Sequence, residues 1–176
     1  MHIKLSKRLS KALRHDPAHL GLTLDAAGWT DITAVLAALR VDRASLDAVV
    51  AENNKQRFAY DESGTRIRAS QGHSVPVDLG LLPATPPDVL YHGTVAAVLP
   101  AIMADGLRPM NRHHVHLSAT RETAVRVGAR RGKPVILVID AAAMTADCHV
   151  FHVSANGVWL TDHVPSRYFD LPGGPR

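Results

Sequence analysis

Arginine and histidine recur in short polar strings along this sequence of 176 residues. The strings are LRHDP at 13–17, KQRF at 55–58, QGHS at 71–74, YHGT at 91–94 and NRHHVHLSAT at 111–120. A guanidinium group stays protonated and offers paired donors to phosphate oxygens, and histidine can move a proton near neutral pH. These residue types therefore suit chemistry on a phosphate group. Arg14 and His15 have an alternative interpretation as caps of a helix end, where cations suit the helix dipole.

Three histidines between residues 113 and 116 raise the question of a metal site. In a strand His114 and His116 share one face while His113 points to the other, and no cysteine or glutamate lies near them in the sequence. We therefore predict that the protein needs no metal.

Basic residues are concentrated at the start of the chain. The formal net charge is +4, and the first 14 residues contain no Asp or Glu to offset Lys4, Lys7, Arg8, Lys11 and Arg14. Such a face suits a polyanionic partner, although a solvated helix surface is the plain alternative.

The composition is that of a globular protein, with 46% hydrophobic and 20% charged residues. No stretch approaches the roughly 18 apolar residues of a membrane helix, and the basic N-terminus lacks the apolar run of a secretory signal. We expect a cytoplasmic protein without a membrane partner. The single cysteine, Cys148, agrees with a reducing compartment and is predicted to be a small buried residue.

The elements that must position the polar strings begin with three short helices. Leu5, Leu9 and Leu13 form an apolar stripe over residues 4–14, and Pro17 ends that pattern. Asp31 and Asp42 are typical N-caps for helices over residues 32–40 and 43–53. Residues 55–69 are predicted to form a hairpin with its turn at residues 61–64. Three helices followed by a hairpin predict a winged helix.

A change of composition separates this region from the rest of the chain. Residues 75–88 contain four prolines and are the predicted linker, so residues 1–74 form one lobe and residues 89–176 a second. The second lobe is predicted as a mixed α+β sheet structure with strands at 88–94, 113–118 and 134–140. A helix is expected at 95–105, interrupted at Pro100, and another after Ser118 and Thr120. Asn156-Gly157 marks a final hairpin.

Taken together and in this order, the five strings resemble those of the KptA-type RNA 2′-phosphotransferases. GARRGKPVILVID at 128–140 and NGVWL at 156–160 follow in place, so the resemblance covers nearly the whole chain. It implies an N-terminal winged-helix lobe that binds RNA and a C-terminal ADP-ribosyltransferase-like lobe that binds NAD. It also implies an RNA partner carrying a 2′-phosphate, tRNA-like or other.

The resemblance implies a reaction in two steps. The RNA 2′-phosphate attacks the nicotinamide-bearing ribose carbon of NAD and expels nicotinamide, which leaves a phospho-ADP-ribosylated RNA. The ribose 2″-hydroxyl then attacks the phosphorus and releases RNA with a 2′-hydroxyl and ADP-ribose 1″,2″-cyclic phosphate. Matching motif by motif places the catalytic set at Arg14, His15, Arg57 and Arg112.

The same resemblance implies the residues that bind NAD. His92 would contact the ribose, Gly93 would let the backbone approach the nicotinamide amide, and His116 would be a second residue of the fold. Thr94 belongs to the same motif. Ser118 and Thr120, at the start of a predicted helix, have hydroxyls and nearby backbone donors suited to the NAD diphosphate, and plain helix capping is an equally compatible interpretation. Gln71, His73 and Ser74 either line the site or belong to a polar linker.

One feature separates this chain from protein-modifying ADP-ribosyltransferases, which commonly carry a glutamate on the last hairpin. The chain contains only Glu52, Glu62 and Glu122, and the matching place near Val158 is apolar. Two alternatives remain. One is a transferase that leaves ADP-ribose on nucleic-acid phosphate ends, against which the complete cationic set argues. The other is a non-catalytic NAD-sensing nucleic-acid binder, which would bind NAD without releasing nicotinamide.

Overall fold

The computed structural model describes residues 2–52 and 56–171. The chain divides into two compact units, unit 1 (Met1–Leu81) and unit 2 (Leu82–Arg176), and the division lies within the predicted linker at 75–88. Each unit is described by itself. Within the described ranges no helix is both long enough and apolar enough to span a bilayer.

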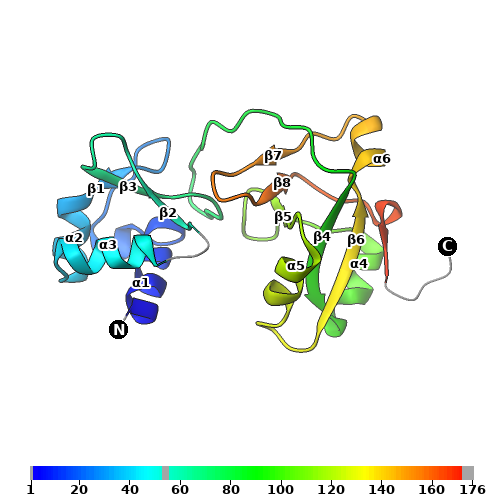
Figure 1. Cartoon of the computed structure of the whole chain (residues 1–176), viewed down its shortest axis with the longest axis horizontal. Coiled ribbons are helices and arrows are strands. Elements are labelled where there is room, and N and C mark those ends of the chain that lie inside the picture. The colour runs from blue at the N-terminus through cyan, green and yellow to red at the C-terminus, as the bar shows by residue number, and fades with distance from the viewer. Residues whose placement is uncertain (1, 53–55, 172–176) are drawn as a thin grey trace. The chain divides into compact units, whose positions relative to one another are not determined.

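Unit 1 begins with three helices, α1 (His2–Arg14), α2 (Ile32–Leu39) and α3 (Arg43–Ala51), with a short 3-10 helix at Ala18–Leu20 after the first (Figure 1). The predicted caps are present. The Asp31 carboxylate accepts from the backbone N–H of Thr33, and the Asp42 carboxylate accepts from that of Ser45. The predicted third helix ends at Ala51 rather than at residue 53, which lies outside the described residues.

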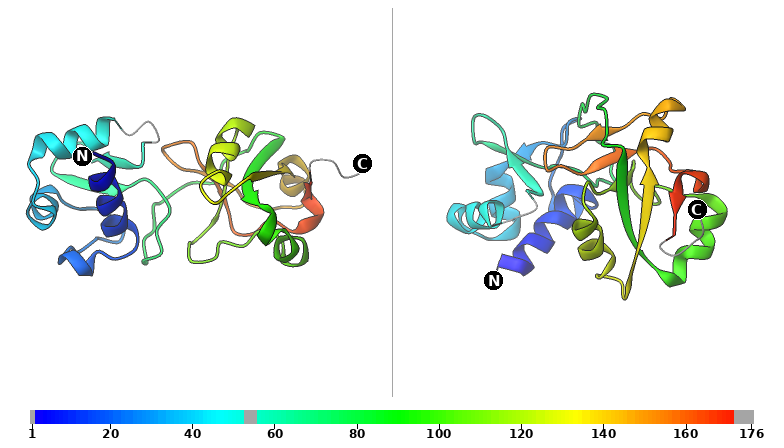
Figure 2. Two further views of the ribbon diagram at one scale, coloured as in Figure 1. Left: turned by 90° about the horizontal axis from the view of Figure 1, so that it is seen from below. Right: turned by 45° about the vertical axis from the view of Figure 1, so that its right-hand side comes forward.

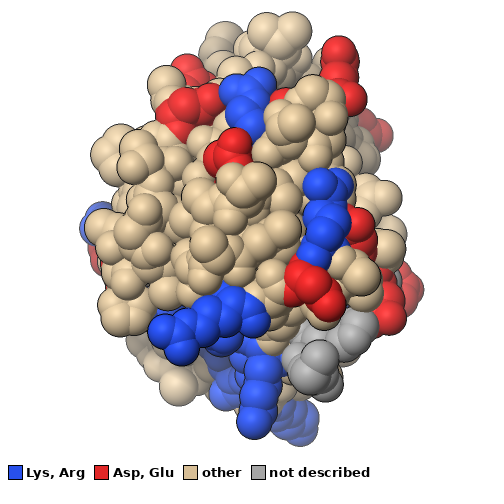
Figure 3. Space-filling model, turned by 90° about the vertical axis from the view of Figure 1, so that its left-hand side faces the viewer, with Lys and Arg blue, Asp and Glu red and all other residues tan. Residues whose placement is uncertain are grey.

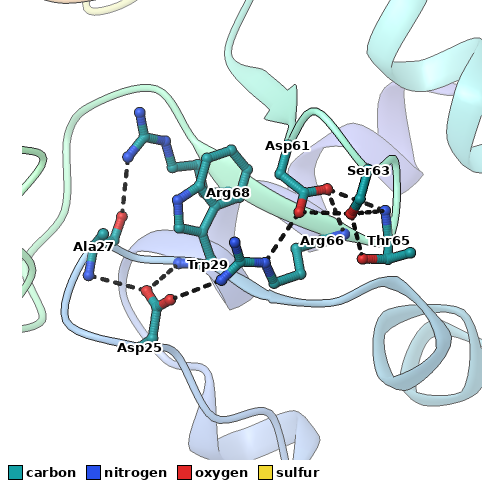
Figure 4. Close-up of polar contacts among 8 residues, drawn as sticks. All are labelled: Asp25, Ala27, Trp29, Asp61, Ser63, Thr65, Arg66 and Arg68. Atoms are coloured by element: carbon teal, nitrogen blue, oxygen red, sulfur yellow. Dashed lines mark hydrogen bonds and ion pairs between the residues drawn. The ribbon is translucent and has the colours of Figure 1, made fainter.

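Three short strands complete unit 1: β1 (Thr30–Asp31), β2 (Phe58–Tyr60) and β3 (Arg66–Ala69), paired antiparallel in the order β1-β3-β2. The turn between β2 and β3 is organised by Asp61. Its carboxylate accepts from the backbone N–H groups of Thr65 and Arg66, both at 3.0 Å, and from the Ser63 hydroxyl (Figure 4).

The core of unit 1 comes from all three helices and the sheet. The apolar stripe of α1 is buried as predicted, and it packs with Leu46 of α3, Phe58 of β2 and Ile67 of β3. Burial of this stripe orients α1 so that its last residue, Arg14, lies against the sheet side of the unit rather than in open solvent.

The larger sheet of unit 2 has the order β4-β6-β9, all antiparallel. Its strands are β4 (Val89–Val95), β6 (Pro134–Asp140) and β9 (Phe169–Asp170). The apolar run PVILVID is the central strand, as its continuous hydrophobicity predicts. His92 pairs with Leu137 and Gly93 with Ile136.

A second sheet of unit 2 has the order β5-β8-β7. It consists of β5 (Val115–Leu117), β7 (His152–Val153) and β8 (Trp159–Thr161). Strands β7 and β8 form the hairpin predicted at Asn156-Gly157, and Gly157 has the positive φ of 74° that favours glycine. An antiparallel bridge between Tyr91 and Ser118 joins the two sheets.

Helices flank the larger sheet of unit 2 on both sides. Figure 2 shows α5 (Arg121–Gly128) on one side of the β4–β6 pair and α4 (Leu99–Asp105) on the other. The predicted interruption near Pro100 appears as a 3-10 turn at Ala96–Val98 that precedes α4. Helix α6 (Ala141–Ala146), the 3-10 turn at Ser166–Tyr168 and β9 were not among the predicted elements.

The chain is thus a mixed α+β protein with several small antiparallel sheets, as the sequence predicts at this level. One local prediction was wrong. Cys148 is exposed rather than buried, because it follows the end of α6 in a left-handed backbone conformation with φ of 65°. Its side chain therefore does not contribute to the core.

Candidate functional site

Arg14 and Arg57 lie close together in unit 1. The Arg14 side chain is 8% exposed, and its Nη2 donates to the backbone carbonyl of Arg57 at 3.5 Å. The Arg14 guanidinium carbon also lies 6.0 Å from the centre of the Phe58 ring. The end of α1 is therefore held against the start of β2, and two residues 43 positions apart in the chain are brought together.

His15 directly follows α1 and is exposed. Its Nδ1 lies 2.9 Å from the hydroxyl of Ser74, and the Ser74 backbone N–H donates to the Arg14 carbonyl at 2.8 Å. Residues 71–74 are therefore attached to the end of α1, with His73 buried at 3% exposure, while Gln71 is half-buried. Unit 1 thus gathers three of the four residues of the predicted catalytic set, Arg14, His15 and Arg57.

In unit 2, His92 on β4 is connected to His116 on β5. His92 Nδ1 lies 3.0 Å from the backbone carbonyl of His116, and since a carbonyl only accepts, Nδ1 carries the proton. Burial lowers the pKa of His92, and the nearby Arg131 and Arg112 lower it further. The ring is therefore neutral near pH 7, with Nε2 available as a hydrogen-bond acceptor.

His116 in turn receives a hydrogen bond from the fourth residue of the set. Arg112 Nη1 lies 3.2 Å from His116 Nδ1. Because a guanidinium only donates, His116 Nδ1 accepts, which places the proton of the neutral ring on Nε2. Arg112, His116 and His92 thus form one hydrogen-bonded chain in unit 2, although Arg112 itself lies outside any helix or strand.

The pKa of Arg112 is also lowered, first by desolvation and then by the charges of Arg131 and Arg130. Among the described residues, no ion pair joins any of these three arginines to a carboxylate. Arg130 and Arg131 are candidate site residues that the sequence interpretation missed. The signal was present in the quoted string GARRGKP, whose positive charges were given no role.

Gly93 and Thr94 follow His92 on β4. A Cβ at Gly93 would lie 1.8 Å from the backbone oxygen of Ala124 on α5, so the strand and helix touch through their backbones there. This contact gives a structural reason for glycine at this position. It is separate from the predicted role of Gly93, which is to let the backbone approach the nicotinamide amide. Thr94 is buried at 6% exposure.

Ser118 and Thr120 lie between β5 and α5. The backbone of Ser118 exchanges two hydrogen bonds with Tyr91, at 2.8 and 2.9 Å. Thr120 is the N-cap of α5, its hydroxyl accepting from the Thr123 backbone N–H at 3.3 Å. Both residues therefore lie at the start of α5, which is where an anion would meet the helix dipole.

No group of three or more His, Cys, Asp or Glu side chains is arranged to hold a metal ion within the described residues. His114 lies 3.7 Å from Asp162, and burial lowers its pKa, which leaves this histidine uncharged near neutral pH.

Comparison with known proteins agrees with these motifs. Residues 1–163 match the family described as RNA 2'-phosphotransferase, Tpt1 / KptA family. This chain belongs to that family. It is accordingly an enzyme, an RNA 2′-phosphotransferase.

Similarity to individual family members extends over almost the full length. A "Probable RNA 2'-phosphotransferase" of Streptomyces coelicolor is 64% identical, with 97% of this chain and 95% of that protein covered. Proteins of the same description from Burkholderia pseudomallei and Trichormus variabilis are 53% and 51% identical. The similarity to the Burkholderia pseudomallei protein covers 97% of this chain and 95% of that protein. The similarity to the Trichormus variabilis protein covers 96% of each.

Proposed function

We propose that this family member removes a 2′-phosphate from RNA by transferring it to NAD, in the two steps that the motif resemblance implies. Arg14, His15, Arg57 and Arg112 form the proposed catalytic set. The observation that carries the proposal is the hydrogen-bonded chain from Arg112 through His116 to His92. It joins a residue suited to the RNA phosphate with a residue suited to the NAD ribose.

The state of His92 fits a ribose hydroxyl. With its proton on Nδ1 and engaged by the His116 carbonyl, the neutral ring can accept a hydrogen bond at Nε2 from a hydroxyl group. An imidazolium at this position would instead favour an anion. Burial, together with the charges of Arg131 and Arg112, lowers the pKa of His92 and so favours the neutral form.

The arginines of the proposed catalytic set suit the phosphate group that is transferred from RNA to NAD. In the first step a phosphate oxygen forms a bond to the ribose carbon as nicotinamide departs with the electron pair. In the second step the 2″-hydroxyl oxygen bonds to phosphorus, and the RNA 2′-oxygen leaves and takes up a proton. A positioned donor of this kind is worth roughly 10²- to 10³-fold in rate. We assign Arg57 to bracing the phosphorus in the second step, and His15 to donating to the phosphate or moving a proton.

The last hairpin supports a phosphate nucleophile rather than a protein side chain. Val158 precedes β8 where protein-modifying ADP-ribosyltransferases commonly have a glutamate, and the turn before it is closed by Ser154, whose hydroxyl accepts from the Val158 backbone N–H at 3.1 Å. No carboxylate from this hairpin is available to polarise a ribose hydroxyl, so the RNA phosphate supplies the nucleophilic charge.

Unit 1 is the proposed winged-helix RNA lobe and unit 2 the proposed NAD lobe. In unit 1 the order of helices and strands is that of a winged helix, and α1 has a basic face. Lys4, Lys7 and Arg8 are exposed on it, and Lys11 pairs with Asp16 at 3.4 Å. Basic side chains gather at the lower edge of the face in Figure 3, and α1 is the lowest helix of unit 1 in Figure 1. Such a surface attracts the RNA backbone in a salt-dependent manner.

The decisive experiment incubates the full chain with NAD and an oligonucleotide that carries one internal 2′-phosphate. We expect free nicotinamide, RNA with a 2′-hydroxyl, and ADP-ribose 1″,2″-cyclic phosphate. Omission of NAD should abolish all three products. Absence of dephosphorylated RNA and of the cyclic phosphate in the complete reaction would refute the proposal.

Transfer of ADP-ribose to the phosphate ends of a nucleic acid is the second candidate. It would use the same NAD contacts and stop after the first step. Retention of all four cationic residues argues against it, because the second-step role proposed for Arg57 has no use in that reaction. An oligonucleotide with a terminal phosphate and no 2′-phosphate distinguishes the two, since only the second candidate yields a stable ADP-ribosylated end as its main product.

A further inference from the structure

We propose that Arg130 and Arg131 form, with Arg112, a binding site for the RNA backbone next to the 2′-phosphate. The proposal deepens the proposed function and rests on it. These arginines lie in the loop between α5 and β6, a segment for which the motifs assigned no role.

The loop is fixed beside the NAD motif by backbone contacts on both of its sides. Before it, a Cβ at Gly128 would lie 3.0 Å from the Thr94 carbonyl oxygen and 3.2 Å from the Gly93 carbonyl carbon. After it, Pro134 and Val135 pair with Val95 and Thr94 in the β4–β6 ladder. The loop therefore has little freedom to move away from the end of β4.

Arg112 approaches the same place from another segment. Its hydrogen bond to His116, and the bond from His92 to the His116 carbonyl, tie it to β4. The pKa values of Arg112 and His92 are both lowered by the charge of Arg131, which agrees with their proximity. Arg112 and the loop that carries Arg130 and Arg131 are thus both held beside β4, and no carboxylate is paired with these arginines among the described residues.

Positive side chains held beside one another attract an anion, and guanidinium groups offer paired donors to phosphate oxygens. Arg130 and Arg131 are exposed, and Arg112 keeps exposed surface although its guanidinium is partly desolvated, so a ligand can reach all three. Protein-internal ion pairs would be the ordinary way to neutralise them, as Arg108 is paired with Asp105 at 3.5 Å in the same unit. The missing partner is therefore best supplied by a substrate that carries several negative charges.

The length of α5 favours RNA over the NAD diphosphate as that substrate. The proposed diphosphate contacts, Ser118 and Thr120, precede α5, whereas Arg130 and Arg131 follow it. A helix of 8 residues is about 12 Å long at about 1.5 Å per residue, which exceeds the span of a diphosphate. Arg112, moreover, is the unit 2 residue assigned to the RNA phosphate. Phosphodiesters flanking that phosphate provide the additional charges.

The test compares R130Q/R131Q with a matched control, R108Q/R126Q. The control removes the same number of charges from exposed positions of the same unit, and Arg126 has a hydrogen bond only to Thr123 within the described residues. Binding of a fluorescent oligonucleotide with one internal 2′-phosphate is measured without NAD at several salt concentrations. The KM for NAD is measured separately, and thermal unfolding checks that both variants are folded.

We expect R130Q/R131Q to bind the RNA at least about tenfold more weakly at low salt. The slope of log Kd against log salt should fall by about 1 to 2, while the KM for NAD stays within about twofold of the wild type. The control should bind RNA like the wild type. A raised KM for NAD with unchanged RNA affinity would assign the arginines to the diphosphate and overturn the proposal, and so would equal losses in both variants.

The proposed function is tested in the same samples by the formation of dephosphorylated RNA once NAD is added. Wild-type protein that binds the oligonucleotide but forms no dephosphorylated RNA would refute the proposed function, whereas the inference is judged by the difference in affinity between the two variants.

Discussion

The ring of His92 donates through Nδ1 to the backbone carbonyl of His116, 3.0 Å away. This single contact decides which nitrogen carries the proton and leaves Nε2 as an acceptor. It also joins β4 to β5, so the orientation of the proposed NAD residue depends on the segment that carries Arg112.

Substitution of His92 by asparagine or by glutamine tests the contributions of its two ring nitrogens one at a time. H92N keeps a donor near Nδ1 but has no atom at the place of Nε2, whereas H92Q keeps a polar atom near Nε2. Loss of one hydrogen bond of about 1 kcal/mol should raise the KM for NAD roughly fivefold in H92N and less in H92Q. The KM for RNA should not change. Equal KM values for NAD in H92N and the wild type would contradict the proposed contact.

The pH dependence of NAD binding follows from the lowered pKa of His92. An ordinary histidine protonates near pH 6.5, but burial and the charges of Arg131 and Arg112 lower the pKa of His92, so its ring stays neutral at that pH. We expect the KM for NAD to rise as the pH falls, with a midpoint below pH 6.5. H92Q should lose this rise, and a rise centred at or above pH 6.5 in the wild type would contradict the assignment.

The lowered pKa of His92 also links its protonation to the free energy of unfolding. Because His92 binds its proton at higher pH in the unfolded chain than in the folded one, the free energy of unfolding should fall as the pH drops from about 6.5 towards the folded pKa. Urea unfolding of the wild type and H92Q across this range measures the contribution of His92.

Replacement of Arg57 tests whether this residue acts in the second step of the reaction. R57A should lower the rate of product formation by roughly 10²- to 10³-fold and accumulate phospho-ADP-ribosylated RNA, which denaturing gels resolve. R57K keeps the charge but not the paired donors and should be intermediate. Loss of product without accumulation of that RNA in R57A would show that Arg57 does not act in the second step.

Gly93 is expected to tolerate no side chain. In G93A the new Cβ would overlap the backbone oxygen of Ala124, so α5 must move from β4. We expect unit 2 to lose at least about 3 kcal/mol of unfolding free energy, measured by urea denaturation. A124G should not rescue the variant, because the overlap involves a backbone atom. An unchanged unfolding midpoint in G93A would contradict the close contact.

Asp61 should stabilise the β2–β3 turn in a pH-dependent manner. Hydrogen bonds from Arg66, Ser63 and Thr65 lower the pKa of Asp61 to about 2. The lowered pKa means that its stabilisation is complete above about pH 4 and is lost as the pH falls towards 2. D61N should therefore unfold at lower urea concentration than the wild type at pH 7, and the difference should shrink below pH 4.

The network around this turn contains more than Asp61. Figure 4 shows Arg66 between Asp61 and Asp25, with the Trp29 ring beside Arg66 and Arg68. Their guanidinium carbons lie 5.6 and 4.4 Å from the ring centre. Trp29 is half-buried under these arginines. The stacking explains why an indole is tolerated at the edge of unit 1.

Local features were predictable because the residues that cause them are neighbours in the chain. Asp31 and Asp42 cap helices whose first N–H groups lie two or three positions away, and Asn156-Gly157 closes a turn within its own hairpin. The five motif strings likewise needed no structure to indicate the family. Cys148 shows the limit of this reasoning, since its exposure depends on where α6 ends and how the chain turns there.

The sequence alone determined the motif set, the helix caps, the turns and the family to which they belong. Only the tertiary structure decided that Arg14 is buried against Arg57, that His92 is neutral with its proton on Nδ1, and that Arg112 and the loop of Arg130 and Arg131 are held beside the same strand, β4. The physical reason is distance along the chain. Caps and turns depend on residues a few positions apart, whereas burial, tautomer and charge clustering depend on segments that meet only when the chain folds.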